Sequence, residues 1–174
     1  MKNTFLYLLM FTSIIFFSTI KLTAQTAVSL EAVAEVITSL SVNEGVTLNF
    51  GRFSPEASGG TIIISTEGAR SKTGTLAFGT GVYNQAIFQI TGQPTYNLKM
   101  TGPTGPAVLT KVGDTKTMAI SDWTIAPNFG TTGVIIPASG TLQVKVGATL
   151  TVGTIEANPA GIYKGEYELS FFYE

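Results

Sequence analysis

Short hydrophobic runs recur along the chain, and clusters of glycine, proline, serine and asparagine separate them. The runs are rich in β-branched and aromatic residues, so the pattern predicts strands rather than helices. They fall at residues 47–51, 61–65, 75–78, 86–92, 95–100, 118–125 and 141–153, and a further strand ends the chain. Stretches such as SPEASGG, TGPTGP and EANPAG between them have the composition of loops. Strands at this spacing predict an all-β fold, an immunoglobulin-like sandwich of short antiparallel strands in two sheets.

The last fourteen residues, GIYKGEYELSFFYE, carry the strongest alternation in the chain. Side chains of one parity are aromatic or aliphatic, namely Tyr163, Tyr167, Leu169, Phe171 and Tyr173. Side chains of the other parity include Lys164, Glu166 and Glu168. Because successive residues of a strand point to opposite faces, the first set is predicted to face the core and the second set the solvent.

The segment at residues 27–40, AVSLEAVAEVITSL, fits two structures. An extended chain would place Val28, Leu30, Ala32, Ala34 and Val36 on one face. A helix would instead form a stripe of Leu30, Val33, Ala34 and Ile37, and the alanine and glutamate content favours that helix. Periodicity alone favours the strand by a small margin.

The first 24 residues have the pattern of a secretory signal peptide. Lys2 precedes an apolar run at residues 5–20, and the small residue Ala24 offers a cleavage site. Sixteen apolar residues are short against the roughly 20 that span a bilayer, so no lipid-spanning segment is expected after cleavage. The sequence therefore predicts export through the periplasm to the cell surface or the extracellular space, with residues 25–174 as a single domain.

Composition narrows the chemistry of this exported domain. Removal of Lys2 and Lys21 with the signal leaves eight basic residues against eleven acidic ones, which argues against nucleic acid as a partner. The chain has no histidine and no cysteine, so the usual general bases, thiol nucleophiles and zinc ligands are absent. The only two aspartates, Asp114 and Asp122, do not belong to a clustered oxygen-ligand pattern such as D-x-D-x-D-G. We therefore expect no enzyme activity, no cofactor and no catalytic, cofactor-binding or metal-binding residues.

Two further features carry weaker chemical hypotheses. Glu166 and Glu168 could pair as glycosidase carboxylates, but a solvated strand face explains them better. Trp123 could serve as a stacking platform for a sugar, although a lone tryptophan is more often part of a core or its rim.

Two stretches together indicate a family. VTLNFGRFSP at residues 46–55 follows an Ala/Val-rich segment, and AGIYKGEYELSFFYE ends the chain. The sequence resembles the secreted bacterial family called domain of unknown function 4402, and it also resembles a cysteine-free relative of spore-coat-U-type pilins of archaic chaperone–usher systems. Tyr173 matches the penultimate tyrosine of such pilins, and Gly161 matches their glycine fourteen residues from the end. The disulfide found in many of those pilins has no counterpart here.

The resemblance implies a structural, pilin-like subunit of a bacterial surface fibre or coat, assembled by donor-strand exchange. Its partners would be like subunits, with a periplasmic chaperone and an usher. Residues 25–37 would supply the donor strand through Val28, Leu30, Ala32, Ala34 and Val36. The acceptor side would comprise Gly161, Tyr163, Tyr167, Leu169, Phe171 and Tyr173. The same alternation also suits a self-contained secreted β-sandwich, an adhesin-like domain that binds glycan or a surface protein through Trp123 and loops such as PNFGTTG.

We predict that the exported protein begins at Gln25 or Thr26, because Ala24 follows an apolar run of signal-peptide length. N-terminal sequencing of the protein recovered from the cell surface tests this. Recovery of surface protein that still begins at Met1 would contradict the prediction.

Overall fold

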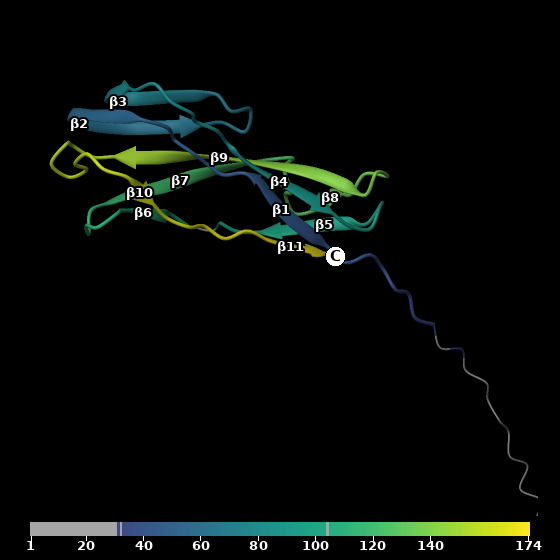
Figure 1. The fold of residues 1–174 in the computed structure, drawn as a ribbon. Helices are drawn as coiled ribbons and strands as arrows, with labels where there is room; N and C mark the ends of the chain where they lie inside the picture. The colour runs from purple at the N-terminus through teal and green to yellow at the C-terminus, as the bar shows by residue number, and fades with distance from the viewer. Residues whose placement is uncertain (1–30, 32, 104) are drawn as a thin grey trace, which may run out of the picture. The chain divides into compact units, whose positions relative to one another are not determined.

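A computed structural model of the chain describes residue 31 and residues 33–103 and 105–174. In this part the regular secondary structure consists of strands alone (Figure 1), which confirms the all-β prediction. The strands are β1 (Ser41–Val46), β2 (Phe53–Ile64), β3 (Arg70–Phe78), β4 (Ala86–Thr91), β5 (Asn97–Thr101), β6 (Ala107–Lys111), β7 (Thr117–Ala126), β8 (Val134–Ile135), β9 (Thr141–Val152), β10 (Tyr163–Lys164) and β11 (Ser170–Tyr173). Residues Ile37–Glu174 form one compact unit, and the following description concerns that unit.

The long strand β9 organises the larger of two antiparallel sheets. On one edge it pairs first with β4 and then with β2, and on the other edge it pairs with β7. β1 extends the sheet beyond β4, β3 extends it beyond β2, and β6 and β10 extend it beyond β7. A second sheet has the order β11-β5-β8. This arrangement confirms the predicted two-sheet sandwich.

The core consists of two clusters that β9 connects. The first core cluster comprises Phe50, Ile62, Ile64, Leu76, Met118, Ile120, Ala148, Leu150 and Val152. The second core cluster comprises Ala86, Ile90, Leu98, Phe129, Ile136, Val144 and Val146. Even-numbered residues of β9 enter both clusters because alternate side chains of a strand share one face.

Glycine residues allow an irregular pairing between β2 and β3. The register between these strands shifts between Pro55 and Gly59, and the backbone at Gly59 has a φ of 69°. A Cβ atom at Gly59 would overlap the carbonyl oxygen of Val152, so the neighbouring strand excludes any larger residue. The loop predicted for SPEASGG is therefore wrong. This stretch belongs to β2 and contains a β-bulge, where loop-like residues bend a paired strand.

The strand predicted at residues 47–51 is also wrong. That stretch makes only an isolated bridge between Asn49 and Asn84, and Gly51 has a φ of 75°. The terminal strand forms in two pieces, β10 and β11, with residues 165–169 outside regular pairing. β1 and β6, which lack strong apolar alternation, were not predicted.

For the ambiguous segment at residues 27–40, the structure describes residue 31 and residues 33–40, which form neither strand nor helix. The remainder lies outside the described residues. Both predictions for this segment therefore fail over its described part.

Candidate functional site

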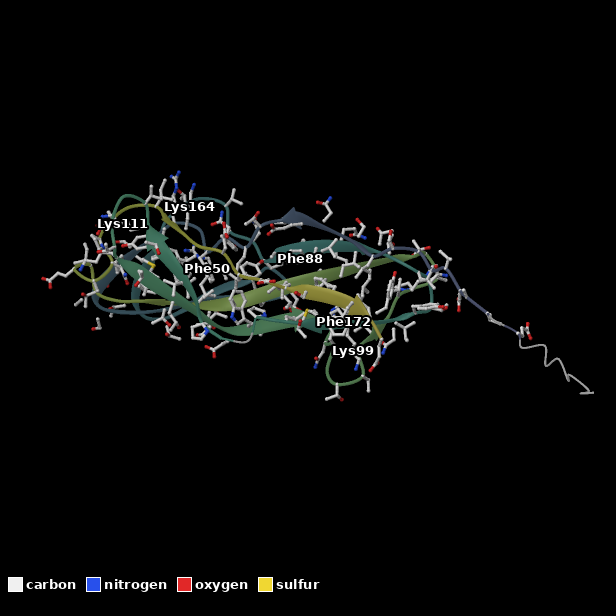
Figure 2. The ribbon with its side chains drawn as sticks, turned by 90° about the horizontal axis from the view of Figure 1, so that it is seen from below. Phe50, Phe88, Lys99, Lys111, Lys164 and Phe172 are labelled. Atoms are coloured by element: carbon white, nitrogen blue, oxygen red, sulfur yellow. The ribbon has the colours of Figure 1, made fainter. Side chains whose placement is uncertain are left out.

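A groove of about 1390 Å³ runs between two stretches that are far apart in the sequence. One wall is formed by residues 47–53, the connection from β1 together with the first residue of β2, and the other by residues 158–167 near the C-terminus. Figure 2 labels Phe50, which lines this groove, and it shows Lys111 and Lys164 at one end of the domain, away from Lys99 and Phe172. The groove therefore lies beside the first half of the C-terminal segment.

The floor of the groove is apolar and belongs to the first core cluster. Phe50, Met118, Ile120 and Leu150 are 6%, 5%, 3% and 1% exposed, while Leu109 is half-buried. The cluster is therefore covered on most sides, and the groove gives access to its remaining surface. A segment that enters the groove would extend the hydrophobic core of the domain.

The C-terminal wall presents one unpaired strand edge. β10 pairs with β6 and β11 pairs with β5, and each is the outermost strand of its sheet in the described part of the chain. Gly165 allows close approach to β6, because a Cβ atom there would overlap the carbonyl oxygen of Val108. An unpaired edge offers backbone N–H and C=O groups to another strand. The groove thus combines an apolar floor with a backbone that can accept a strand.

Charged side chains occur on both walls. Arg52 lies on the first wall, and Lys164 and Glu166 lie on the second; all three residues are exposed. Beyond Gly161, Lys111 forms an ion pair with Asp114 at an N–O distance of 3.1 Å. The charged side chains that line the groove are therefore exposed, whereas the polar side chain of Asn158 lines it from a buried position.

The alternation predicted for the terminal strand is confirmed. The apolar set from Tyr163 to Tyr173 is half-buried, whereas Lys164, Glu166 and Glu168 are exposed. Of the six predicted acceptor residues, Gly161, Tyr163 and Tyr167 line the groove. Leu169, Phe171 and Tyr173 instead pack against the second core cluster, beyond the residues that line the groove.

The Tyr173 side chain connects the segment before β1 to the rest of the domain by hydrogen bonds. Its hydroxyl accepts a hydrogen bond of 2.7 Å from the backbone N–H of Gln93 and donates one of 3.0 Å to the carbonyl oxygen of Thr38. The backbone N–H of Thr38 in turn donates to Oε1 of Gln93 at 3.0 Å. The penultimate tyrosine therefore holds the chain in place where it approaches β1.

Tyr167 differs from Tyr173 in its polar environment. Its ring packs against Trp123 at a centroid distance of 4.9 Å, and its hydroxyl is buried with no hydrogen-bond partner. Burial raises the pKa of Tyr167 above its ordinary value, and the negative charge of Glu44 adds to the shift. Trp123 is itself half-buried and donates from Nε1 to the carbonyl oxygen of Gly105, so its ring is part of the packing.

The predicted donor residues are described only in part. Val28, Leu30 and Ala32 lie outside the described residues. Ala34 and Val36 are exposed in an irregular segment, and Val36 is 96% exposed. Sequence reasoning missed the groove floor, to which Leu48, Phe50, Leu109, Met118, Ile120 and Leu150 belong. The alternation of 118–125 and 141–153 marked some of them as core but gave no sign that a groove reaches them.

The described residues contain no group of three or more His, Cys, Asp or Glu side chains that could hold a metal ion. The same part of the chain contains no helix long and apolar enough to cross a membrane. The groove, rather than a cluster of reactive groups, is therefore the candidate site.

Comparison with known proteins identifies one family. The family model described as "Domain of unknown function (DUF4402)" matches residues 40–173, nearly the whole of the compact unit. No curated protein and no solved structure matches the chain.

We predict that removing the hydroxyl group lowers stability at Tyr173 but does not lower it at Tyr167. Tyr173→Phe leaves the Gln93 N–H and the Thr38 carbonyl without their partner, so the free energy of unfolding should fall by about 1–3 kcal/mol. Tyr167→Phe removes a buried hydroxyl that makes no hydrogen bond, so stability should be unchanged or higher. Urea denaturation of a protein comprising residues 25–174 measures both, and equal losses in the two variants would contradict the prediction.

The raised pKa of Tyr167 predicts a dependence of stability on alkaline pH. The unfolded chain ionises this phenol near pH ~10, while the folded chain keeps it protonated to higher pH. The folded wild type therefore keeps its full stability below about pH 10 and loses stability as the pH rises further, because only the unfolded chain releases this proton. Between about pH 8 and pH 11, Tyr167→Phe should lose less free energy of unfolding than the wild type. An identical loss in both proteins would show that Tyr167 is not involved.

Proposed function

The chain belongs to the DUF4402 family, and we propose that it is an exported structural subunit of a bacterial surface fibre or coat. In this proposal the subunits join by strand exchange, with the N-terminal segment of one copy lying in the groove of the next. The observation that carries the proposal is the groove itself, in which an unpaired strand edge lies beside an apolar floor.

The backbone of the C-terminal segment supports strand addition. Both β10 and β11 have one paired edge and one edge without a strand partner among the described residues. An incoming extended segment can pair with such an edge, and each backbone hydrogen bond contributes about 0.5–1.5 kcal/mol. Main-chain pairing of this kind provides affinity, and the side-chain positions of the groove provide selectivity.

The N-terminal segment has the side chains that the floor requires. Its one-parity set combines Val28, Leu30 and Val36 with the small residues Ala32 and Ala34. Full burial of each of the three larger side chains is worth roughly 1.5–3 kcal/mol. Ordering costs about 1–2 kcal/mol for each residue, so the segment gains most when it docks along the full groove.

The segment is also long enough. The two lining stretches contain seven residues (47–53) and ten residues (158–167), which extended strands span in about 23 Å and about 33 Å. Residues 25–37 span about 40 Å when extended, so they are long enough to cover the groove.

The anchor at Thr38 favours exchange between copies. Thr38 is bound to Tyr173 beside the second core cluster, whereas the groove opens on the first cluster. The segment of the same chain would have to fold back along the C-terminal strand and would reach the groove only with its first residues. The segment of a second copy has no such restriction.

The pilin resemblance adds two proposed partners, a periplasmic chaperone and an usher. A groove with an apolar floor and an unpaired edge favours aggregation until it is covered. A chaperone that occupies the groove during export would prevent this aggregation. An usher would then replace the chaperone with the N-terminal segment of the next subunit.

We predict that Leu30→Asp blocks assembly. In the docked segment the new carboxylate would be buried without a partner, at a cost of several kcal/mol. Val33→Asp is the matched control, because Val33 has the opposite parity and should face solvent in the docked strand. Surface extracts run unheated in detergent should show a ladder for the wild type and for Val33→Asp, and monomer alone for Leu30→Asp.

A peptide of residues 26–37 should bind to the Leu30→Asp protein, since its groove is intact and unoccupied by its own variant segment. Two results would contradict the proposal. One is a wild type that stays monomeric in surface extracts at every concentration. The other is a Leu30→Asp ladder equal to that of the wild type.

A further inference from the structure

Five side chains from three parts of the chain form a cation–aromatic patch away from the groove floor: Arg52, Arg70, Lys72, Phe78 and Tyr83. The guanidinium carbon of Arg70 lies 3.7 Å from the ring centroid of Phe78 and 5.4 Å from that of Tyr83. Nζ of Lys72 lies 5.4 Å from the Phe78 ring. An NH2 group of Arg70 donates to the carbonyl oxygen of Arg52 at 2.8 Å. These contacts make the patch one connected surface.

The patch keeps a large apolar surface in contact with solvent. Phe78 is 40% exposed, Tyr83 is 43% exposed, and the neighbouring Val82 is 72% exposed. Two aromatic rings and a valine exposed side by side are unusual on a domain whose other aromatic side chains mostly pack in or near the core. Such a surface is typical of a binding site.

The positive charge of the patch has no carboxylate partner. The ion pairs among the described residues join Lys99 to Glu174 and Lys111 to Asp114, and both lie elsewhere. Lys72 donates one hydrogen bond to the carbonyl oxygen of Leu76, which leaves its other N–H groups available. The side chain of Arg52 makes no hydrogen bond or ion pair in the described part of the chain and is exposed. The patch is therefore a concentrated positive charge on an acidic protein.

The position of Arg70 in the patch is fixed before any ligand arrives. Arg70 is held between the two rings and the backbone of Arg52, so it positions the rings and its charge together. The loop after β3 carries Gly79 and Gly81, and Cβ atoms there would lie 3.2 Å and 3.5 Å from the Arg52 side chain. The absence of side chains at these glycines leaves room for the Arg52 side chain beside the loop. Because Arg70 is already held, a ligand that binds here loses little free energy in ordering Arg70.

We infer that this patch binds an anionic polysaccharide of the uronic acid type. The carboxylates of neighbouring sugar units pair with Arg52 and Lys72, and the apolar faces of the sugar rings pack against Phe78 and Tyr83. A repeating sugar acid supplies both a flat apolar face and a carboxylate in every unit. An acidic peptide supplies the charge without the flat apolar face.

This inference goes beyond subunit assembly and does not depend on it. Lys72, Phe78 and Tyr83 do not line the groove, so variants at these positions change none of its lining side chains. Arg52 lies on both surfaces and is therefore kept out of the decisive comparison. The patch would let an assembled subunit hold a capsule or matrix polymer of matching chemistry.

The test measures binding of polygalacturonate to the mature protein by calorimetry or biolayer interferometry. The wild type should bind, more weakly as salt increases, and methyl-esterified polygalacturonate should bind at least tenfold more weakly because its carboxylates are masked. Lys72→Gln and Tyr83→Ala should each weaken binding about fivefold to tenfold, while thermal melting shows that both variants remain folded. Lys116→Gln is the matched control, since Lys116 is also an exposed lysine but lies on the turn between β6 and β7.

Several outcomes would overturn the inference. They are no binding to polygalacturonate, equal binding of the methyl-esterified polymer, and equal loss of binding in Lys116→Gln. Equal or tighter binding of poly-glutamate or of an oligothymidylate would assign the patch to an acidic peptide or a nucleic acid instead. Retention of full binding in Tyr83→Ala would show that charge alone is recognised and would also reject the proposed sugar contact.

Discussion

The alternation of β9 holds the domain together. Over twelve residues its inward side chains pass from the second core cluster, at Val144 and Val146, to the first, at Ala148, Leu150 and Val152. Its edges bind β4 and β2 on one side and β7 on the other, so most of the larger sheet depends on one register. A slip of one residue would turn every one of these side chains outward, which makes this register the most strongly specified feature of the fold.

The C-terminal segment forms an edge of each of the two sheets and, in the described part of the chain, is not surrounded by other strands on both sides. It pairs with β6 through β10 and with β5 through β11, so it crosses from the larger sheet to the smaller one within a few residues. Each piece has a neighbour on one side only among the described residues. Strands β2, β7 and β9 contribute most of the side chains of the first core cluster. Next to residues 161–167 the cluster borders the groove.

Sequence reasoning succeeded where the hydrophobic pattern and the local structure agree. The period-2 alternation of 141–153 and of the C-terminal residues identified β9 and the inward parity of Tyr167, Leu169 and Phe171. It failed where backbone geometry decides. SPEASGG has the residues of a loop, yet Gly59 uses its positive φ to form a bulge inside β2, and the apolar residues 47–51 form a groove wall instead of a strand. The groove floor could not be predicted, because buried core residues and groove residues such as Leu150 have the same sequence signature.

The hydrogen bonds of Tyr173 have a mechanical consequence. In a fibre of the proposed kind, tension would enter each domain through the backbone at Thr38, beside the second core cluster, and leave through the segment seated in the groove at the first cluster. The backbone at Thr38 continues into β1, which pairs with β4, and β4 pairs with β9, so the load would reach the strands that carry both clusters. The two hydrogen bonds of the Tyr173 hydroxyl would brace the point where this load enters and delay the peeling of β1 from its end.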